Sequence, residues 1–69
     1  MEISYDKIAD ALYITLSEKM VFKTAKINDN MLVDLDKKGK ILGIEILTAS
    51  SQISKQKLSA GNIALRAIV

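Results

Sequence analysis

The sequence predicts a β-dominated α+β domain, in which an antiparallel meander of about five short strands is followed by a short helix. Short runs of apolar residues alternate with polar ones, which is the period of half-buried strands. Clusters of Asp, Asn and Gly separate these runs, as expected for turns. Apolar residues make up 49% of the 69-residue chain and aromatic residues only 4%. We therefore expect one small domain over residues 1–69 with an aliphatic core.

The first hairpin is predicted by alternation over residues 2–5 and again over residues 11–16. Asp6 and Asp10 flank the turn between these strands, where short carboxylates can accept hydrogen bonds from backbone amides. Tyr5 supplies an apolar ring whose hydroxyl can reach the rim of the sheet. The core face is expected to carry Leu12, Ile14, Leu16, Val33 and Ile44.

Three further strands are predicted by the same alternation, over residues 21–27, 31–35 and 41–47. A turn over 28–30 and a hairpin loop over 36–40 separate them. Gly39 can adopt the positive φ that closes such a loop. Gly43 marks a bulge or the close approach of another group. These short connections favour pairing between strands that are neighbours in the sequence.

The period changes near the C-terminal end. Thr48 is a candidate N-cap for a surface helix over residues 49–58, with Ile53 and Leu58 turned inward. Residues 62–69 fit either a short helix or a sixth C-terminal strand. The turn-like Gly61-Asn62 and the β-branched Ile68 and Val69 favour the strand slightly.

The composition excludes several kinds of catalytic site. The chain has no Cys and no His, so Ser/His/Asp and Cys/His arrangements are excluded, together with the usual zinc sites. We expect no catalytic residue, no metal and no cofactor.

The N-terminus lacks the pattern of a secretory signal, and no run approaches the ~20 apolar residues of a membrane span. A cytoplasmic protein without a membrane partner is therefore expected.

Charge is distributed unevenly along the chain. Residues 1–36 carry a net charge of −3 and residues 37–69 a net charge of +5. Such a basic half is compatible with nucleic-acid binding, but no aromatic residue follows Phe22 to stack on a base. A solvated surface is therefore favoured over a nucleic-acid site. The candidate nucleic-acid contacts are Lys37, Lys38, Lys40, Lys55, Lys57 and Arg66.

Several acidic residues could belong to a site. Asp34, Asp36 and Glu45 have some of the spacing of a calcium loop, but Lys38 occupies a ligand position and Glu45 falls within a predicted strand, so a hairpin turn is favoured. Glu45 is expected to face solvent or to pair with a lysine across the sheet. The candidate functional or turn residues are Tyr5, Asp6, Asp10, Asp34, Asp36 and Glu45.

Several blocks occur in order along the chain: Tyr5-Asp6-Lys7, residues 9–14, Val33-Asp34, Asp36, Gly39, residues 43–47 and Ala49-Ser50. Together these blocks resemble a small prokaryotic family, the domain of unknown function 2283. The resemblance covers about residues 1–53 and leaves 54–69 as a C-terminal extension. Ile8 stands where the family often has glutamate. Relatives are often encoded beside small proteins that look like ribonuclease-type toxins, which implies an interaction or antitoxin role.

Three classes of function follow from these observations. A non-enzymatic protein-interaction module, antitoxin-like towards a small toxin, is expected first, as a homodimer or with a small protein partner, because a short sheet leaves open edges. Nucleic-acid binding through the basic half is the alternative. An enzyme that depends on carboxylates or a metal comes third, since it would need a pocket that shifts carboxylate pKa values.

Overall fold

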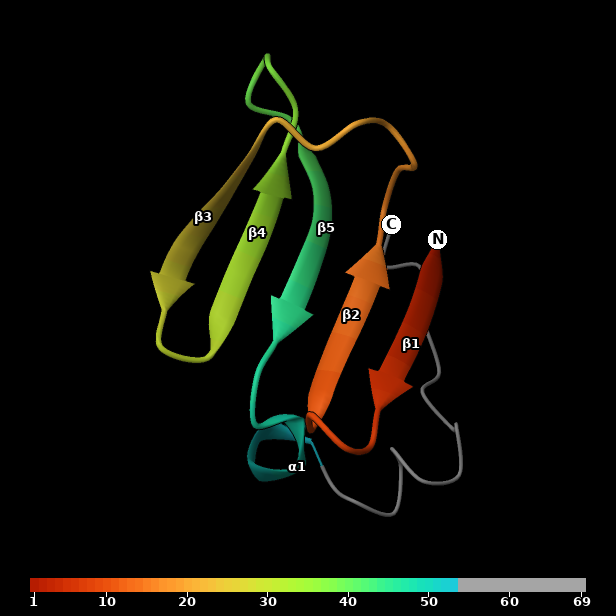
Figure 1. Cartoon of the computed structure of the whole chain (residues 1–69), viewed down its shortest axis with the longest axis vertical. Helices are drawn as coiled ribbons and strands as arrows, with labels where there is room; N and C mark the ends of the chain where they lie inside the picture. Colours follow the sequence, from red (N-terminus) through yellow and green to blue (C-terminus); the bar gives the residue numbers. More distant parts are fainter. Residues whose placement is uncertain (54–69) are drawn as a thin grey trace, which may run out of the picture.

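A computed structural model describes residues 1–53, which form one antiparallel five-stranded sheet followed by a short helix (Figure 1). This architecture confirms the predicted fold class. The predicted alternatives for residues 62–69 lie outside the described residues. The elements are β1 (Glu2–Asp6), β2 (Ala11–Thr15), β3 (Lys23–Asn28), β4 (Met31–Leu35), β5 (Ile41–Ile46) and α1 (Ala49–Gln52).

The strand order departs from the chain order at one connection. The order is β1-β2-β5-β4-β3, so the predicted pairing of β2 with β3 is wrong, whereas the other sequential pairs form. β5 is apolar except for Glu45. It lies in the centre of the sheet, which is the position that buries an apolar strand most fully. β3 carries Lys23 and Lys26, and lysines are characteristic of edge strands.

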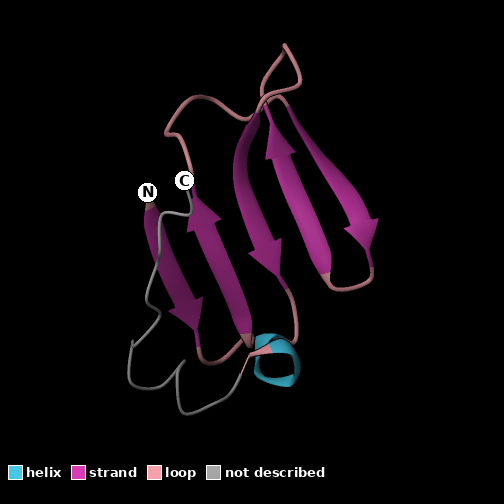
Figure 2. Ribbon diagram, turned by 180° about the vertical axis from the view of Figure 1, so that it is seen from behind, coloured by secondary structure: helices cyan, strands magenta, loops and turns pink. Residues whose placement is uncertain are grey.

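Residues 16–22, here termed the crossing segment, carry the chain from β2 across the end of the sheet to β3 (Figures 1 and 2). The Leu16 and Ser17 amides donate to the Leu42 carbonyl at 2.8 and 3.0 Å. The Phe22 amide donates to the Leu35 carbonyl at 2.8 Å. The crossing segment is thus fixed to β5 and β4, and β3 begins at Lys23 rather than at Val21.

The register gives the sheet one apolar and one polar face. Ile14 of β2 lies opposite both Ile3 of β1 and Ile44 of β5, and Ile44 lies opposite Val33 of β4. Directly opposed residues project from the same face, so these side chains define the apolar face, as predicted. The polar face is defined by Ser4, Tyr13, Glu45, Asp34 and Thr24.

The core lies where α1 meets the apolar face. Leu12 and Ala49 are 2% and 0% exposed. The partly buried side chains of Ile3, Tyr5, Ile14, Ile46 and Ile53 pack around them. Leu16 was expected on this face, but it lies beyond the end of β2 and is 44% exposed.

The helix is shorter than the sequence predicts. It ends at Gln52, because Ile53 is already extended, so the helix predicted to reach Leu58 is wrong in length. Ile53 does pack inward, as expected, while Leu58 lies outside the described residues. Thr48 is the N-cap residue of α1, as predicted, but it has a positive φ and makes no capping hydrogen bond through its side chain. Within residues 1–53, no helix is long and apolar enough to cross a membrane.

We expect Leu12→Ala to destabilise the domain by about 2 to 5 kcal/mol, the usual cost of emptying a buried site. A small domain has only about 5 kcal/mol in total, so little folded protein should remain. Ile14→Ala should cost less, because Ile14 is only half-buried. Urea denaturation followed by circular dichroism checks this, with Ile8→Ala as the control, since Ile8 is 99% exposed. Equal losses at Leu12 and Ile8 would contradict the assigned core.

Candidate functional site

Asp10 joins the first turn of the chain to the helix. Its carboxylate accepts hydrogen bonds from the Tyr5 hydroxyl at 2.7 Å, the Ser50 amide at 3.0 Å and the Ser50 hydroxyl at 2.7 Å. Its backbone carbonyl accepts the Ala49 amide at 2.8 Å. The amides at a helix start have no partner within the helix, so Asp10 caps α1 from 40 residues away in the sequence.

Asp6 has the local role that the sequence predicts. Its Oδ1 accepts the Ile8 and Ala9 amides at 2.9 and 3.1 Å, which closes the turn between β1 and β2. Asp6 accepts hydrogen bonds within its own turn, whereas Asp10 accepts them from Tyr5 and Ser50. The hydrogen bond to Asp10 raises the pKa of Tyr5, which keeps that hydroxyl a donor.

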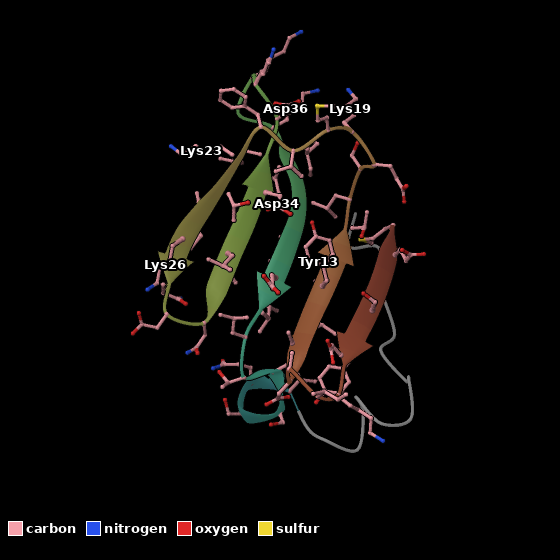
Figure 3. The ribbon with its side chains drawn as sticks, viewed as in Figure 1. Tyr13, Lys19, Lys23, Lys26, Asp34 and Asp36 are labelled. Carbon is pink, nitrogen blue, oxygen red and sulfur yellow. The ribbon has the colours of Figure 1, made fainter. Side chains whose placement is uncertain are left out.

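A second set of contacts crosses the polar face (Figure 3). The Tyr13 hydroxyl donates to Asp34 Oδ2, and the Thr24 hydroxyl donates to Asp34 Oδ1 at 2.6 Å. The Tyr13 ring reaches Asp34 by lying over Gly43 of β5. A Cβ at Gly43 would lie 2.7 Å from Tyr13 Cζ and closer still to its hydroxyl oxygen. Gly43 thus admits the close approach that the sequence predicts.

This set of contacts is suited to structure rather than to proton transfer near neutral pH. The hydrogen bond to Asp34, followed by burial, raises the pKa of Tyr13 from its ordinary 10.0 to about 12. Because the folded state holds this proton more tightly than the unfolded state, the resulting stability is present below pH 10 and is lost as the pH rises through about 12. Tyr13 therefore remains a hydrogen-bond donor near neutrality.

Asp36 builds the β4–β5 hairpin loop. Its Oδ1 accepts the Lys38 and Lys40 amides at 2.8 and 2.9 Å, and its backbone carbonyl accepts the Gly39 amide at 3.0 Å. Gly39 has φ +83°, as expected for closing this loop. The backbone amide of Lys40, helped by that of Lys38 and by nearby lysine charges, holds the pKa of Asp36 below its ordinary value. The carboxylate is therefore ionised and used within its own loop.

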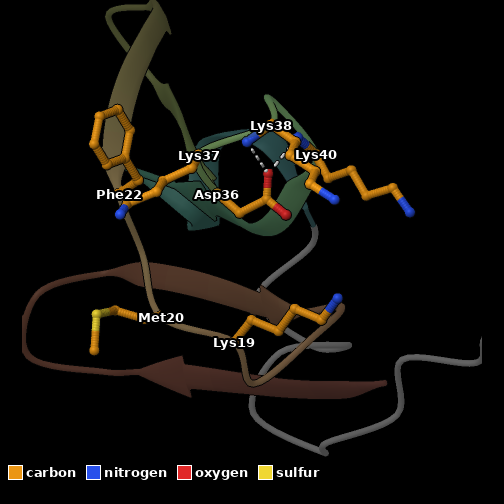
Figure 4. A pocket seen from close by; sticks show the side chains of 7 residues that line it. All are labelled: Lys19, Met20, Phe22, Asp36, Lys37, Lys38 and Lys40. Carbon is orange, nitrogen blue, oxygen red and sulfur yellow. Dashed lines mark hydrogen bonds between the residues drawn. The ribbon is translucent and has the colours of Figure 1, made fainter.

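The hairpin loop and the crossing segment enclose a pocket of about 390 Å³ (Figure 4). We term it the lysine pocket, defined by Lys19, Met20, Phe22, Asp36, Lys37, Lys38 and Lys40. Figure 4 shows Lys19 and Met20 on the crossing segment, across the pocket from the loop that carries Asp36 and the other lysines. Four lysines and one aspartate give the lining a net charge of +3.

The structure does not gather the acidic candidates into one site. Asp34 lies on the polar face and Asp36 in the hairpin loop. Glu45 projects from the polar face between Tyr13 and Leu32 and is half-buried there. The ion pair within residues 1–53 is Lys26–Asp29, at 3.2 Å, so Glu45 has no lysine partner there. The same residues contain no group of three or more acids that could hold a metal ion.

The basic candidates are only partly brought together. Lys37, Lys38 and Lys40 share the lysine pocket, whereas Lys55, Lys57 and Arg66 lie outside the described residues. The sequence analysis missed the contributions of Lys19, Met20, Phe22, Thr24 and Ser50. Only Gly43 signalled a close contact in advance, because the other contacts depend on strand order and on the path of the crossing segment.

We expect Asp10→Ala to lower the free energy of unfolding by about 2 to 4 kcal/mol, since it removes several hydrogen bonds to a charged group. Alanine also fits poorly at the positive φ of 53°. Asp6→Ala should cost only about 0.5 to 2 kcal/mol, as for a lost cap. Ser50→Ala removes one hydroxyl that donates to Asp10. Its loss of unfolding free energy should be smaller than that of Asp10→Ala. Denaturant melts rank the variants, and an Asp10→Ala protein as stable as the parent would contradict the capping role.

We expect Gly43→Ala to destabilise the sheet by about 1 to 3 kcal/mol, because the added methyl group overlaps the Tyr13 ring. In a Tyr13→Ala background the same change should be neutral or stabilising, since glycine weakens a strand relative to alanine. Tyr13→Phe keeps the ring and is the matched control, in which the penalty should persist. A double-mutant cycle from urea melts measures the coupling; additive losses would show that the ring does not limit this position.

Comparison with known proteins shows the family. No curated protein and no solved structure is significantly similar to the chain. A family model described as "Protein of unknown function (DUF2283)" matches residues 2–50. The matched segment includes all five strands, the crossing segment and the Asp10–Ser50 contact. Since the match covers more than half of the sequence, the chain belongs to the DUF2283 family of proteins of unknown function.

Proposed function

We propose that this protein is a non-enzymatic interaction module of the cytoplasm that binds a small partner protein along the β3 edge of its sheet. In this proposal the role is antitoxin-like, and the partner is the small toxin-like protein that is often encoded beside relatives of this family. The observation that carries the proposal is the open, basic edge formed by β3.

Among residues 1–53, no strand pairs with the outer side of β3. Within that range β3 pairs with β4 alone, and each of its residues except Ala25 is exposed. An edge strand presents backbone groups that an extended segment of another protein can pair with. The exposed side chain of Ile27, 60% accessible, adds apolar area for such a segment.

The charge of the edge selects the partner. Lys23 and Lys26 point away from the rest of the sheet (Figure 3). The strand itself carries no acidic residue, although Lys26 pairs with Asp29 of the following turn in an exposed contact at 3.2 Å. Lysines on an edge also oppose aggregation, and two copies of β3 placed side by side would bring like charges together. We therefore propose a partner segment that carries Asp or Glu, and rank this heteromeric complex ahead of a homodimer.

A homodimer would need another surface. The opposite edge, β1, carries Glu2 and Asp6, so pairing two copies of β1 is opposed by the same like-charge argument. Pairing β1 of one copy with β3 of the next satisfies the charges, but it repeats head to tail and leads to rings or open chains rather than a closed pair. The two edges thus favour an acidic partner at β3.

The described carboxylates support a non-enzymatic role. Asp6, Asp10, Asp34 and Asp36 accept hydrogen bonds from backbone amides or hydroxyls that build turns, the helix start and the sheet. A reaction that used one of these acids would compete with the hydrogen bonds that the acid makes within the fold. A carboxylate- or metal-dependent enzyme therefore remains the least favoured function.

The test is co-purification and light scattering with the protein encoded next to this gene. We expect a complex whose affinity falls at least about tenfold in Lys23→Glu/Lys26→Glu, since close charge pairs contribute strongly to association. Lys7→Glu, in the exposed β1–β2 turn, is the matched control and should bind like the parent. A complex that is insensitive to the β3 changes, or a strict monomer in the presence of the neighbour, would contradict the proposal.

A second candidate function, nucleic-acid binding, is favoured by one observation. Lys37, Lys38 and Lys40 share a pocket with Lys19 and Phe22, which combines positive charge with an aromatic ring. Retention on single-stranded nucleic acid that weakens steeply with salt would support this function; retention that is independent of salt would contradict it.

A further inference from the structure

We infer that the lysine pocket binds a single nucleotide unit, with its phosphate between the lysines and its base against Phe22. This inference deepens the second proposed function, because it assigns ligand chemistry to one site. The unit can be a free nucleotide or one residue of a single-stranded nucleic acid, since both present the same base and phosphate.

The lining matches both parts of a nucleotide. The pocket volume of about 390 Å³ lies within the range of small-ligand sites. Four lysines around one aspartate favour an anion, and lysine is an established point-charge partner for phosphate. Phe22 and Met20 are 63% and 88% exposed, so their apolar surfaces are available to a planar base.

Two parts of the backbone around the pocket, at Phe22 and in the hairpin loop, are held by hydrogen bonds of the fold. The Phe22 amide is bonded to the Leu35 carbonyl at 2.8 Å, which places the aromatic residue at the end of β4. On the other side, the bonds from the Lys38 and Lys40 amides to Asp36 hold the hairpin loop. Binding therefore requires ordering of lysine side chains but not of the hairpin loop that carries Lys37, Lys38 and Lys40, which lowers the entropic cost of association.

Asp36 does not prevent anion binding. Its Oδ1 is directed at two amides of its own loop, so part of its negative charge is already compensated. The surrounding lysines exceed it by three charges. Asp36 therefore acts as a positioning residue, which fixes the loop from which Lys37, Lys38 and Lys40 extend.

The shape favours a nucleotide over an anionic membrane. A membrane surface requires a protruding apolar and basic element, whereas these side chains surround a hollow between two segments (Figure 4). The described lining offers one aromatic ring and no side-chain amide to read a base edge. We therefore expect binding that depends on the presence of a base but varies little with its identity.

The experiment measures binding of adenosine monophosphate, adenosine and inorganic phosphate by calorimetry and by amide chemical shifts. Adenosine monophosphate should bind more tightly than adenosine or inorganic phosphate alone. The amide chemical-shift changes that it causes should be largest in residues 19–22 and 36–40. Phe22→Leu should weaken it at least about fivefold, as for loss of base stacking. Lys38→Gln should weaken it and reduce the salt dependence. Lys7→Gln, in the β1–β2 turn, is the charge-matched control and should bind like the parent.

The outcomes separate this inference from the nucleic-acid function. Equal binding of phosphate and adenosine monophosphate, or no effect of Phe22→Leu in a protein that melts like the parent, would overturn the pocket assignment. Salt-sensitive binding of a single-stranded oligonucleotide that is unaffected by Phe22→Leu would overturn it too, while leaving nucleic-acid binding intact. Binding to vesicles of anionic phospholipid without binding of adenosine monophosphate would overturn it in favour of a membrane surface.

Discussion

The contact between the Asp10 carboxylate and Ser50 joins the covering helix to the sheet. A sheet of short strands needs a covering element to form a core, and α1 is too short to be stable by itself. Asp10 supplies the acceptor that the first turn of α1 requires, and its carbonyl accepts the Ala49 amide. Ala49 is thereby held against Leu12, where both are almost completely buried. The core, the first hairpin and the helix therefore form one unit.

The central position of β5 organises the rest of the sheet. Placing Ile44 between Ile14 and Val33 aligns the apolar face across three strands. On the other face, glycine at position 43 lets the Tyr13 ring pass over β5 to Asp34. The central strand order is thus supported by branched side chains on one face and by a hydrogen-bonded tyrosine on the other. The same order requires a segment that crosses the sheet end.

That crossing segment links the fold to the proposed functions. Its hydrogen bonds to Leu42 and Leu35 bring Lys19 and Phe22 to the hairpin loop, which creates the lysine pocket. It also delivers β3 to the edge, with its lysines directed outward. The two proposed surfaces adjoin at Phe22 and Lys23, which are consecutive in the chain, but they differ in shape. One is a strand edge suited to an extended acidic segment, and the other is a hollow suited to a phosphate and a base.

The sequence by itself determined the local features of this protein. Alternation located the strands, Asp6 and Gly39 closed turns as their residue types predict, and Gly43 indicated a close approach. These features depend on neighbours in the chain, so periodicity and turn chemistry are sufficient to find them. The family blocks also pointed to the group to which the chain belongs.

Only the tertiary structure decided which distant segments meet. Nothing local to Thr48 or Asp10 shows that the cap of α1 comes from a turn 40 residues away. Pairing of β2 with β5 likewise depends on the burial of a whole strand, which local propensity does not register. The lysine pocket follows from that pairing, because Phe22 reaches the hairpin loop only when the chain crosses the end of the sheet. Contacts of this kind are set by the packing of the complete sheet. A pattern of neighbouring residues carries no information about which distant segments come together.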